Sequence, residues 1–102
     1  MIESCHITVT VVDANHVVAA ISGEFDLHAG PLVTAALQPH LGDLVTIDLA
    51  DVTFMDSSAL QCLLQLHTEA LAQGGRLEAG SMSPVVQRVL ELCAFDGALF
   101  SP

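Results

Sequence analysis

Two adjacent hydroxyl side chains, Ser57 and Ser58, directly follow the acidic residue Asp56 where a strand pattern gives way to a helix pattern. Residues 44–50 alternate apolar and polar side chains, whereas residues 57–73 have apolar residues at helical spacing. A hydroxyl at the start of a helix can act as an N-cap. It can also carry a phosphate, because free backbone N–H groups and the helix dipole favour negative charge there. The spacing alone leaves both roles open.

The surroundings of Ser57 do not favour catalysis. A nucleophilic serine needs a base within hydrogen-bond reach and an oxyanion hole, and no G-x-S-x-G elbow surrounds Ser57. His67 lies on the apolar stripe of the predicted helix, roughly 15 Å further along its axis at 1.5 Å per residue. We therefore expect His67 to be a core histidine and the protein not to be an enzyme.

The pattern of histidines and cysteines also argues against a metal site. The five histidines form no i, i+4 pair, and the three cysteines (Cys5, Cys62 and Cys93) form no Cys-x-x-Cys motif. We expect neither a metal nor a cofactor. The cysteines are odd in number and far apart, and the N-terminus lacks the pattern of a signal peptide. Reduced thiols in the cytoplasm are the expectation.

The charge balance restricts the partners that this chain can bind. Among 102 residues there are 12 acids and two bases, which give a formal net charge of −10. This balance argues against nucleic acid and against anionic membrane surfaces, both of which need Lys and Arg. The sequence contains no run of 18 apolar residues, so we expect no helix that is inserted in a membrane. The acidity is compatible with electrostatic steering towards a basic protein partner.

The hydrophobic periodicity predicts alternating strands and helices. We expect strands at 6–12, 17–21, 44–50 with an irregular continuation through 52–54, 76–79 and 99–100, and helices at 31–38, 57–73 and 84–94. Turn residues at 13–16 predict a hairpin between the first two strands. This order predicts a single α/β domain over residues 1–102, a mixed sheet of four to five strands with helices packed on it.

The predicted topology brings several polar residues towards Ser57. Asp26 follows the second strand and Asp56 the third, and a right-handed β-α-β crossover places both strand ends at one edge of the sheet. Glu24 lies two residues before Asp26. On the predicted helix, the stripe Leu60, Leu63, Leu64, His67 and Leu71 should be buried. The opposite face carries Gln61, Cys62 and Gln65, which are short or uncharged and suit contact with a partner.

Three motifs in order resemble the STAS domain of bacterial anti-sigma factor antagonists. They are Gly23-Glu24-Phe25-Asp26, Phe54-Met55-Asp56-Ser57-Ser58-Ala59-Leu60 and Ser83-Pro84-Val85-Val86-Gln87-Arg88-Val89-Leu90. The resemblance covers residues 6–100 and implies the STAS fold. The Ser-Ser pair resembles the phosphorylatable branch of the family. Ala59 stands where the family usually has Gly.

The resemblance implies a phosphorylation switch. The unphosphorylated protein would bind an anti-sigma factor that is also a serine kinase, and so release the sigma factor. The kinase would then phosphorylate Ser57, with Ser58 the less favoured acceptor, and a PP2C-type phosphatase would reverse this. The implied contact residues are Glu24, Asp26, Asp56, Ser58, Ala59, Gln61, Cys62 and Gln65. The alternative is a constitutive STAS subunit of a lipid-transport ATPase complex, or a scaffold that does not switch.

Overall fold

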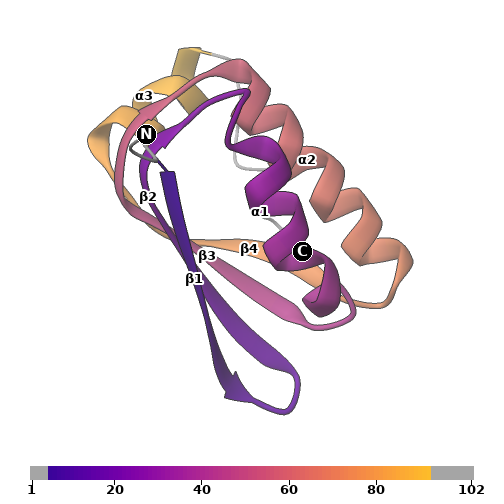
Figure 1. Cartoon of the computed structure of the whole chain (residues 1–102). Coiled ribbons are helices and arrows are strands. Elements are labelled where there is room, and N and C mark those ends of the chain that lie inside the picture. The colour runs from indigo at the N-terminus through magenta and orange to yellow at the C-terminus, as the bar shows by residue number, and fades with distance from the viewer. Residues whose placement is uncertain (1–4, 93–102) are drawn as a thin grey trace.

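Four strands form one sheet in the order β1-β2-β3-β4 in the computed structural model, which describes residues 5–92 (Figure 1). The strands are β1 (Cys5–Asp13), β2 (His16–Phe25), β3 (Leu44–Met55) and β4 (Arg76–Met82). The helices are α1 (Gly30–Leu37), α2 (Ser57–Ala72) and α3 (Pro84–Leu92), with a 3₁₀ turn, η1, at Gln38–His40. The α/β class and the mixed sheet are confirmed.

The pairing of the strands follows the predicted topology. β1 and β2 form an antiparallel hairpin, in whose turn the backbone N–H of Asn15 donates to the Asp13 carboxylate at 2.8 Å. β2 pairs with β3 in parallel, and so does β3 with β4. β2 and β3 both run further than predicted, to Phe25 and Met55. Their last residues interrupt the alternation with bulges, which the periodicity alone does not reveal.

The helices cover the sheet unevenly. α1 contacts β1 and α2, and α2 contacts β4, so these two helices lie side by side over one face of the sheet (Figure 1). α3 contacts β3 and β4. Its N-cap is Ser83, whose hydroxyl accepts the backbone N–H of Val86 at 3.4 Å, as expected for a Ser-Pro helix start.

The buried face of α2 differs from the predicted stripe. Leu60, Leu63 and His67 are buried as expected, but Leu71 is 58% exposed. The remaining buried positions on α2 are Ala59, Leu66 and Ala70. The helix carries more leucines than one face can bury, so the stripe is ambiguous in sequence. Small alanines on the side that faces the sheet allow a close approach, and this packing selects the buried arc.

The ends of α1 and α2 follow from their terminal residues. α1 ends at Leu37 and continues as the 3₁₀ turn that contains Pro39, which agrees with a helix stopped near Gln38. α2 ends in a Schellman motif, because the N–H of Gly75 donates to Ala70 O at 2.8 Å and that of Gly74 to Leu71 O at 3.2 Å. Gly74 adopts a φ of 85°, the left-handed conformation that this cap requires.

Some predictions fall on parts of the chain beyond the described range. The short strand at 99–100, the end of the last helix at Ala94 and the third cysteine, Cys93, lie outside residues 5–92. Within that range, no helix has the length and apolar character needed to cross a membrane.

Candidate functional site

The acidic residues gather at one edge of the sheet because the ends of β2 and β3 are in register. Phe25 and Met55 are partners in the parallel pairing, so Asp26 and Asp56, the residues that follow them, leave the sheet side by side. Gly23 has a φ of 85° between two irregularities of the β2–β3 register, a conformation that other residues rarely adopt. This backbone conformation therefore explains why the first residue of the Gly23–Asp26 motif is glycine.

Asp56, and not either serine, caps helix α2. Its extended backbone precedes the helix, and its carboxylate accepts the N–H of Ala59 at 3.0 Å. Ser57 and Ser58 therefore occupy the first two helical positions. Ser57 is exposed and Ser58 is half-buried, and neither hydroxyl makes a hydrogen bond to the described residues. The cap is thus supplied without the Ser57 hydroxyl, which is left accessible to solvent.

Asp26 organises the loop that leads to α1. Its carboxylate accepts the N–H groups of His28 at 3.0 Å and Ala29 at 3.2 Å, which closes an Asx turn before the helix. Glu24 lies two residues before Asp26, near the end of β2, and its side chain is exposed. The one ion pair among residues 5–92 joins Arg76 to Glu78, at the other end of the sheet. The acidic edge around Ser57 therefore has no basic residue paired with it in the described part of the chain.

A shallow pocket adjoins Ser58 between the loop before α1 and the exposed face of α2. It has a volume of about 330 Å³. Its lining consists of Leu27, Gly30, Pro31, Ser58, Gln61, Cys62 and Gln65. Three predicted contact residues on α2 (Gln61, Cys62 and Gln65) thus lie together with Ser58. The sequence did not lead us to expect three further lining residues, Leu27, Gly30 and Pro31. Leu27 could have been recognised because it is an isolated apolar residue in a polar loop, and it is 66% exposed in the structure.

The thiol of Cys62 joins α1 to α2. Its Sγ lies 3.5 Å from the Thr34 hydroxyl and 3.8 Å from the carbonyl oxygen of Gly30. Cys62 is accordingly half-buried and contributes only part of its side chain to the exposed face.

Ala59 differs from the other predicted contact residues because it is 0% exposed and belongs to the core. Its backbone N–H serves the Asp56 cap, and its methyl group faces inward. A partner cannot touch that methyl group directly, which corrects the expectation that Ala59 contributes a contact of its own.

His67 is a structural histidine, as predicted. It is 8% exposed, and its Nδ1 accepts the backbone N–H of Leu77 at 3.2 Å, which ties α2 to β4. Burial, with a smaller contribution from the positive charge of Arg76, lowers the pKa of His67 and favours the neutral ring that can accept this bond. The ring is therefore engaged in the fold and not placed to act on Ser57.

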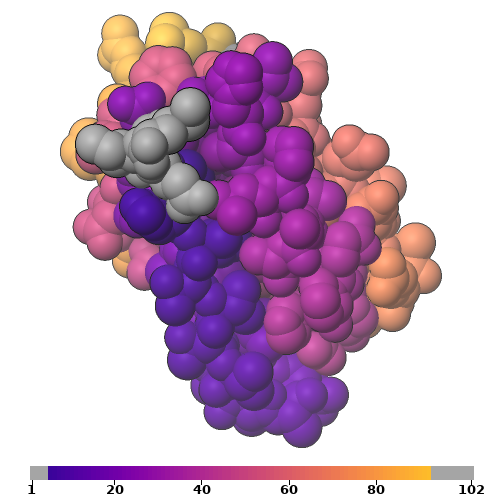
Figure 2. All heavy atoms as spheres, viewed as in Figure 1, coloured from indigo at the N-terminus to yellow at the C-terminus, as the bar shows by residue number. Residues whose placement is uncertain are grey.

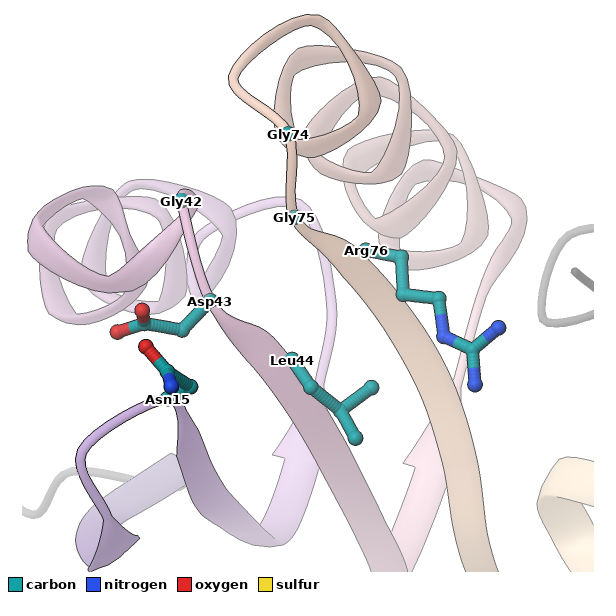
Figure 3. A pocket seen from close by; sticks show the side chains of 7 residues that line it. All are labelled: Asn15, Gly42, Asp43, Leu44, Gly74, Gly75 and Arg76. Carbon is teal, nitrogen blue, oxygen red and sulfur yellow. The ribbon is translucent and has the colours of Figure 1, made fainter.

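A second hollow of about 350 Å³ lies at the opposite end of the sheet. Asn15 and Asp43 point towards one another there, whereas the Arg76 side chain extends away along β4 (Figure 3). Much of the remaining lining is glycine backbone, from Gly42, Gly74 and Gly75. Residues 5–92 contain no group of three His, Cys, Asp or Glu side chains that could hold a metal ion. The lining of this hollow therefore has no cluster of acidic and hydroxyl side chains comparable to the one at the Ser57 edge.

Solved structures of anti-sigma factor antagonists share this fold. SpoIIAA in its unphosphorylated form matches with a TM-score of 0.75 and 24% identity, covering 88% of this chain and 82% of that one. The Bacillus cell fate determinant SpoIIAA in the phosphorylated form gives 0.70 and 24%, covering 88% and 85%. An anti-sigma factor antagonist from Mycobacterium paratuberculosis gives 0.77 and 23%, covering 91% and 80%.

Sequence comparison identifies the family directly. No curated protein sequence matches the chain. The profile of one family, described as "Mlab, STAS domain", matches residues 9–101, which is nearly the whole chain. The STAS fold predicted from the three motifs agrees with both findings. This protein belongs to the Mlab, STAS domain family.

Proposed function

We propose that the protein is an anti-sigma factor antagonist, a binding module without enzymatic activity that is switched by phosphorylation of Ser57. The unphosphorylated form binds an anti-sigma factor serine kinase and so frees the sigma factor. Phosphorylation by that kinase ends the interaction, and a PP2C-type phosphatase restores it. The observation that carries the proposal is the Asp56 cap, because it satisfies the helix start and leaves the Ser57 hydroxyl exposed and unengaged.

The charges around Ser57 supply a physical reason for the switch. A phosphate adds about −1.5 to −2 charges at neutral pH. On Ser57 it would stand next to Asp56, whose neighbour Asp26 leaves the sheet beside it. Like-charge repulsion and the desolvation of the phosphate would then oppose a partner that covers this edge. Within the monomer, the N-terminus of α2 stabilises the added charge, so the fold need not change.

The fold comparisons are consistent with this mechanism. SpoIIAA has been solved in an unphosphorylated and in a phosphorylated form, and both resemble the present chain, with TM-scores of 0.75 and 0.70. A fold that accommodates a phosphate without rearrangement is what the proposal requires. The surface offered to the partner comprises Glu24, Asp26, Asp56 and Ser58 at the sheet edge, with Gln61, Cys62 and Gln65 on α2.

The direct test is phosphosite mapping. The protein is incubated with Mg-ATP and, one at a time, the anti-sigma factor serine kinases encoded in the same genome. We expect one phosphate per chain on Ser57, abolished in Ser57→Ala and retained in Ser58→Ala. Binding to the same kinase, measured by calorimetry, should be lost in Ser57→Asp and kept in Ser57→Ala.

Two results would reject the switch. The first is an absence of modification at Ser57 with every kinase, combined with binding that is indifferent to Ser57→Asp. The second is stable co-purification with a transport ATPase, which would support the constitutive subunit instead. Modification of Ser58 alone would retain a switch but move its acceptor, and Ser58→Asp would then have to abolish binding.

A further inference from the structure

Strand β1 is the outermost strand of the sheet, and its outer edge is open as far as the described part of the chain shows. The strand order ends at β1, so within residues 5–92 no other strand pairs with its outer side. β1 is nine residues long, and its surface forms one side of the molecule, coloured indigo in Figure 2. An open strand edge presents a row of N–H and C=O groups that can pair with another chain.

The composition of β1 lacks the devices that normally protect such an edge. From His6 to Val12 the sequence is His-Ile-Thr-Val-Thr-Val-Val, with no Lys, Pro, Gly or acid. Its pairing with β2 is regular from Ile7 to Val11, and a register shift appears only beyond Val11. Val11 and Val12 are 66% and 55% exposed. Edge strands usually carry charges, proline or bulges along their length to prevent pairing.

The other outer strand, β4, provides a contrast within the same sheet. It has seven residues, contains Gly80 and carries the Arg76–Glu78 ion pair. The His67 ring accepts the N–H of Leu77, so at least one of its main-chain donors already has a partner. β4 therefore has the protection that β1 lacks, and the difference is not a general property of this sheet.

We propose that the outer edge of β1 pairs antiparallel with β1 of a second copy, so that two sheets become one continuous sheet across a two-fold axis near Thr8. In this register Thr8 faces Thr8 of the second copy, Ile7 faces Val9, and His6 faces Thr10. Residues of one side of the sheet always meet residues of the same side. Apolar residues thus meet apolar residues, and polar residues meet polar ones.

The side chains of β1, and not the net charge of the chain, favour a second copy as the occupant. The chain has a net charge of −10, so a dimer interface must avoid placing acids opposite acids. The regular stretch of β1 carries no acid, and Asp13 lies beyond its end. The stretch also has no acid that could bind a basic strand. Its apolar and hydroxyl side chains are therefore best matched by the same strand of a second copy. An isologous interface of this kind closes at two copies.

The Ser57 edge stays accessible in such a dimer. Ser57 follows β3, which is separated from the open edge by β2 and β1. The pairing therefore does not depend on the proposed phosphorylation switch, and the test below uses the protein alone.

The test is sedimentation equilibrium over a wide range of concentrations. We expect a reversible transition from the 10.7 kDa monomer to a species of twice that mass. Thr8→Lys and Thr8→Glu each place like charges at the two-fold axis, and each should weaken dimerisation by at least roughly fivefold. An equimolar mixture of the two variants should restore the dimer, because Lys then faces Glu.

The control is Thr68→Lys, the same substitution at an exposed position on α2. It should dimerise as the unmodified protein does. Thr8 is also exposed, so its variants should fold, which far-ultraviolet circular dichroism checks. A monomer at every concentration, a dimer unaffected by Thr8→Lys, or open-ended aggregation in place of a dimer would each overturn the proposal.

Discussion

The carboxylate of Asp56 accepts the backbone N–H of Ala59 at 3.0 Å, and this single bond separates the capping role from the serines beside it. Because Asp56 is the N-cap, the next residue, Ser57, is the first residue of the helix. The Ser57 hydroxyl takes no part in the capping hydrogen bond. The sequence Asp-Ser-Ser thus divides its functions: the acid stabilises the helix, and the hydroxyl remains available for modification.

Removal of the Asp56 cap should destabilise the protein in a way that depends on the acceptor. Asp56→Ala should lower the free energy of unfolding by about 0.5–2 kcal/mol, because the Ala59 N–H loses its partner. Asp56→Asn keeps an acceptor oxygen and should remain close to the unmodified protein. Urea unfolding of the three proteins measures this, and an equal loss in both variants would show that charge, not the cap, matters.

Replacing Ala59 with Gly tests how this residue affects the site. Ala59 is fully buried within α2, so Ala59→Gly should lower the free energy of unfolding by about 1 kcal/mol through helix propensity. Because its methyl group faces the core, the rate of Ser57 phosphorylation should stay the same. A large increase in that rate at unchanged stability would mean that the methyl group hinders the kinase.

Truncation of Leu27 should weaken partner binding without affecting folding. Leu27 lines the pocket beside Ser58 and is 66% exposed in the free protein. If a partner covers it, Leu27→Ala should weaken binding about tenfold through lost apolar contact. Leu92→Ala, at a residue 72% exposed on α3, is the matched control and should bind normally. Equal affinities in calorimetry would place the interface elsewhere.

The buried His67 should make the protein less stable in mild acid. Burial and the charge of Arg76 hold its pKa below 6.5 in the folded state, so the unfolded chain binds this proton more readily. The contribution of neutral His67 is complete above about pH 6.5 and declines as the pH falls below it. Thermal unfolding between pH 8 and pH 5.5 should show this decline.

His67→Asn is the control for that measurement, because its amide oxygen replaces Nδ1 as an acceptor without titrating in this range. The variant should have a flatter pH dependence than the unmodified protein. His67→Leu, by contrast, should cost about 1–3 kcal/mol at every pH, since the buried Leu77 N–H loses its acceptor. Identical pH profiles for His67→Asn and the unmodified protein would contradict the assignment.

The two glycines after α2 should differ in their tolerance of a side chain. Gly74→Ala meets no neighbour and should cost about 1–2 kcal/mol, the price of a left-handed residue with a Cβ. Gly75→Ala should cost more, because its Cβ would overlap the carbonyl oxygens of Leu41 and Asp43. Unfolding midpoints of the two variants give the order, and a smaller effect at Gly75 would show that the loop at 41–43 yields easily.

Much of the architecture could be predicted because local signals and topology agree. The alternation in β1 and β3, the Ser83-Pro84 helix start and the Gly74-Gly75 stop each have a direct local cause. The Asp26–Asp56 neighbourhood was also predictable, since parallel strands joined by a right-handed crossover end at the same edge. The buried face of α2 was harder to predict from the sequence, because Leu71 and Leu66 are equivalent in hydrophobicity and only the packing of the helix distinguishes them.

The sequence by itself determined the fold class, the edge at which the polar residues meet and the serine pair at the start of a helix. Only the tertiary structure decided that Asp56 holds the cap, that Ala59 faces the core and that Leu27 completes a pocket with Ser58. The reason is physical. Periodicity reports which residues share a face of one element, whereas capping, burial and pocket formation depend on how separate elements approach each other in space.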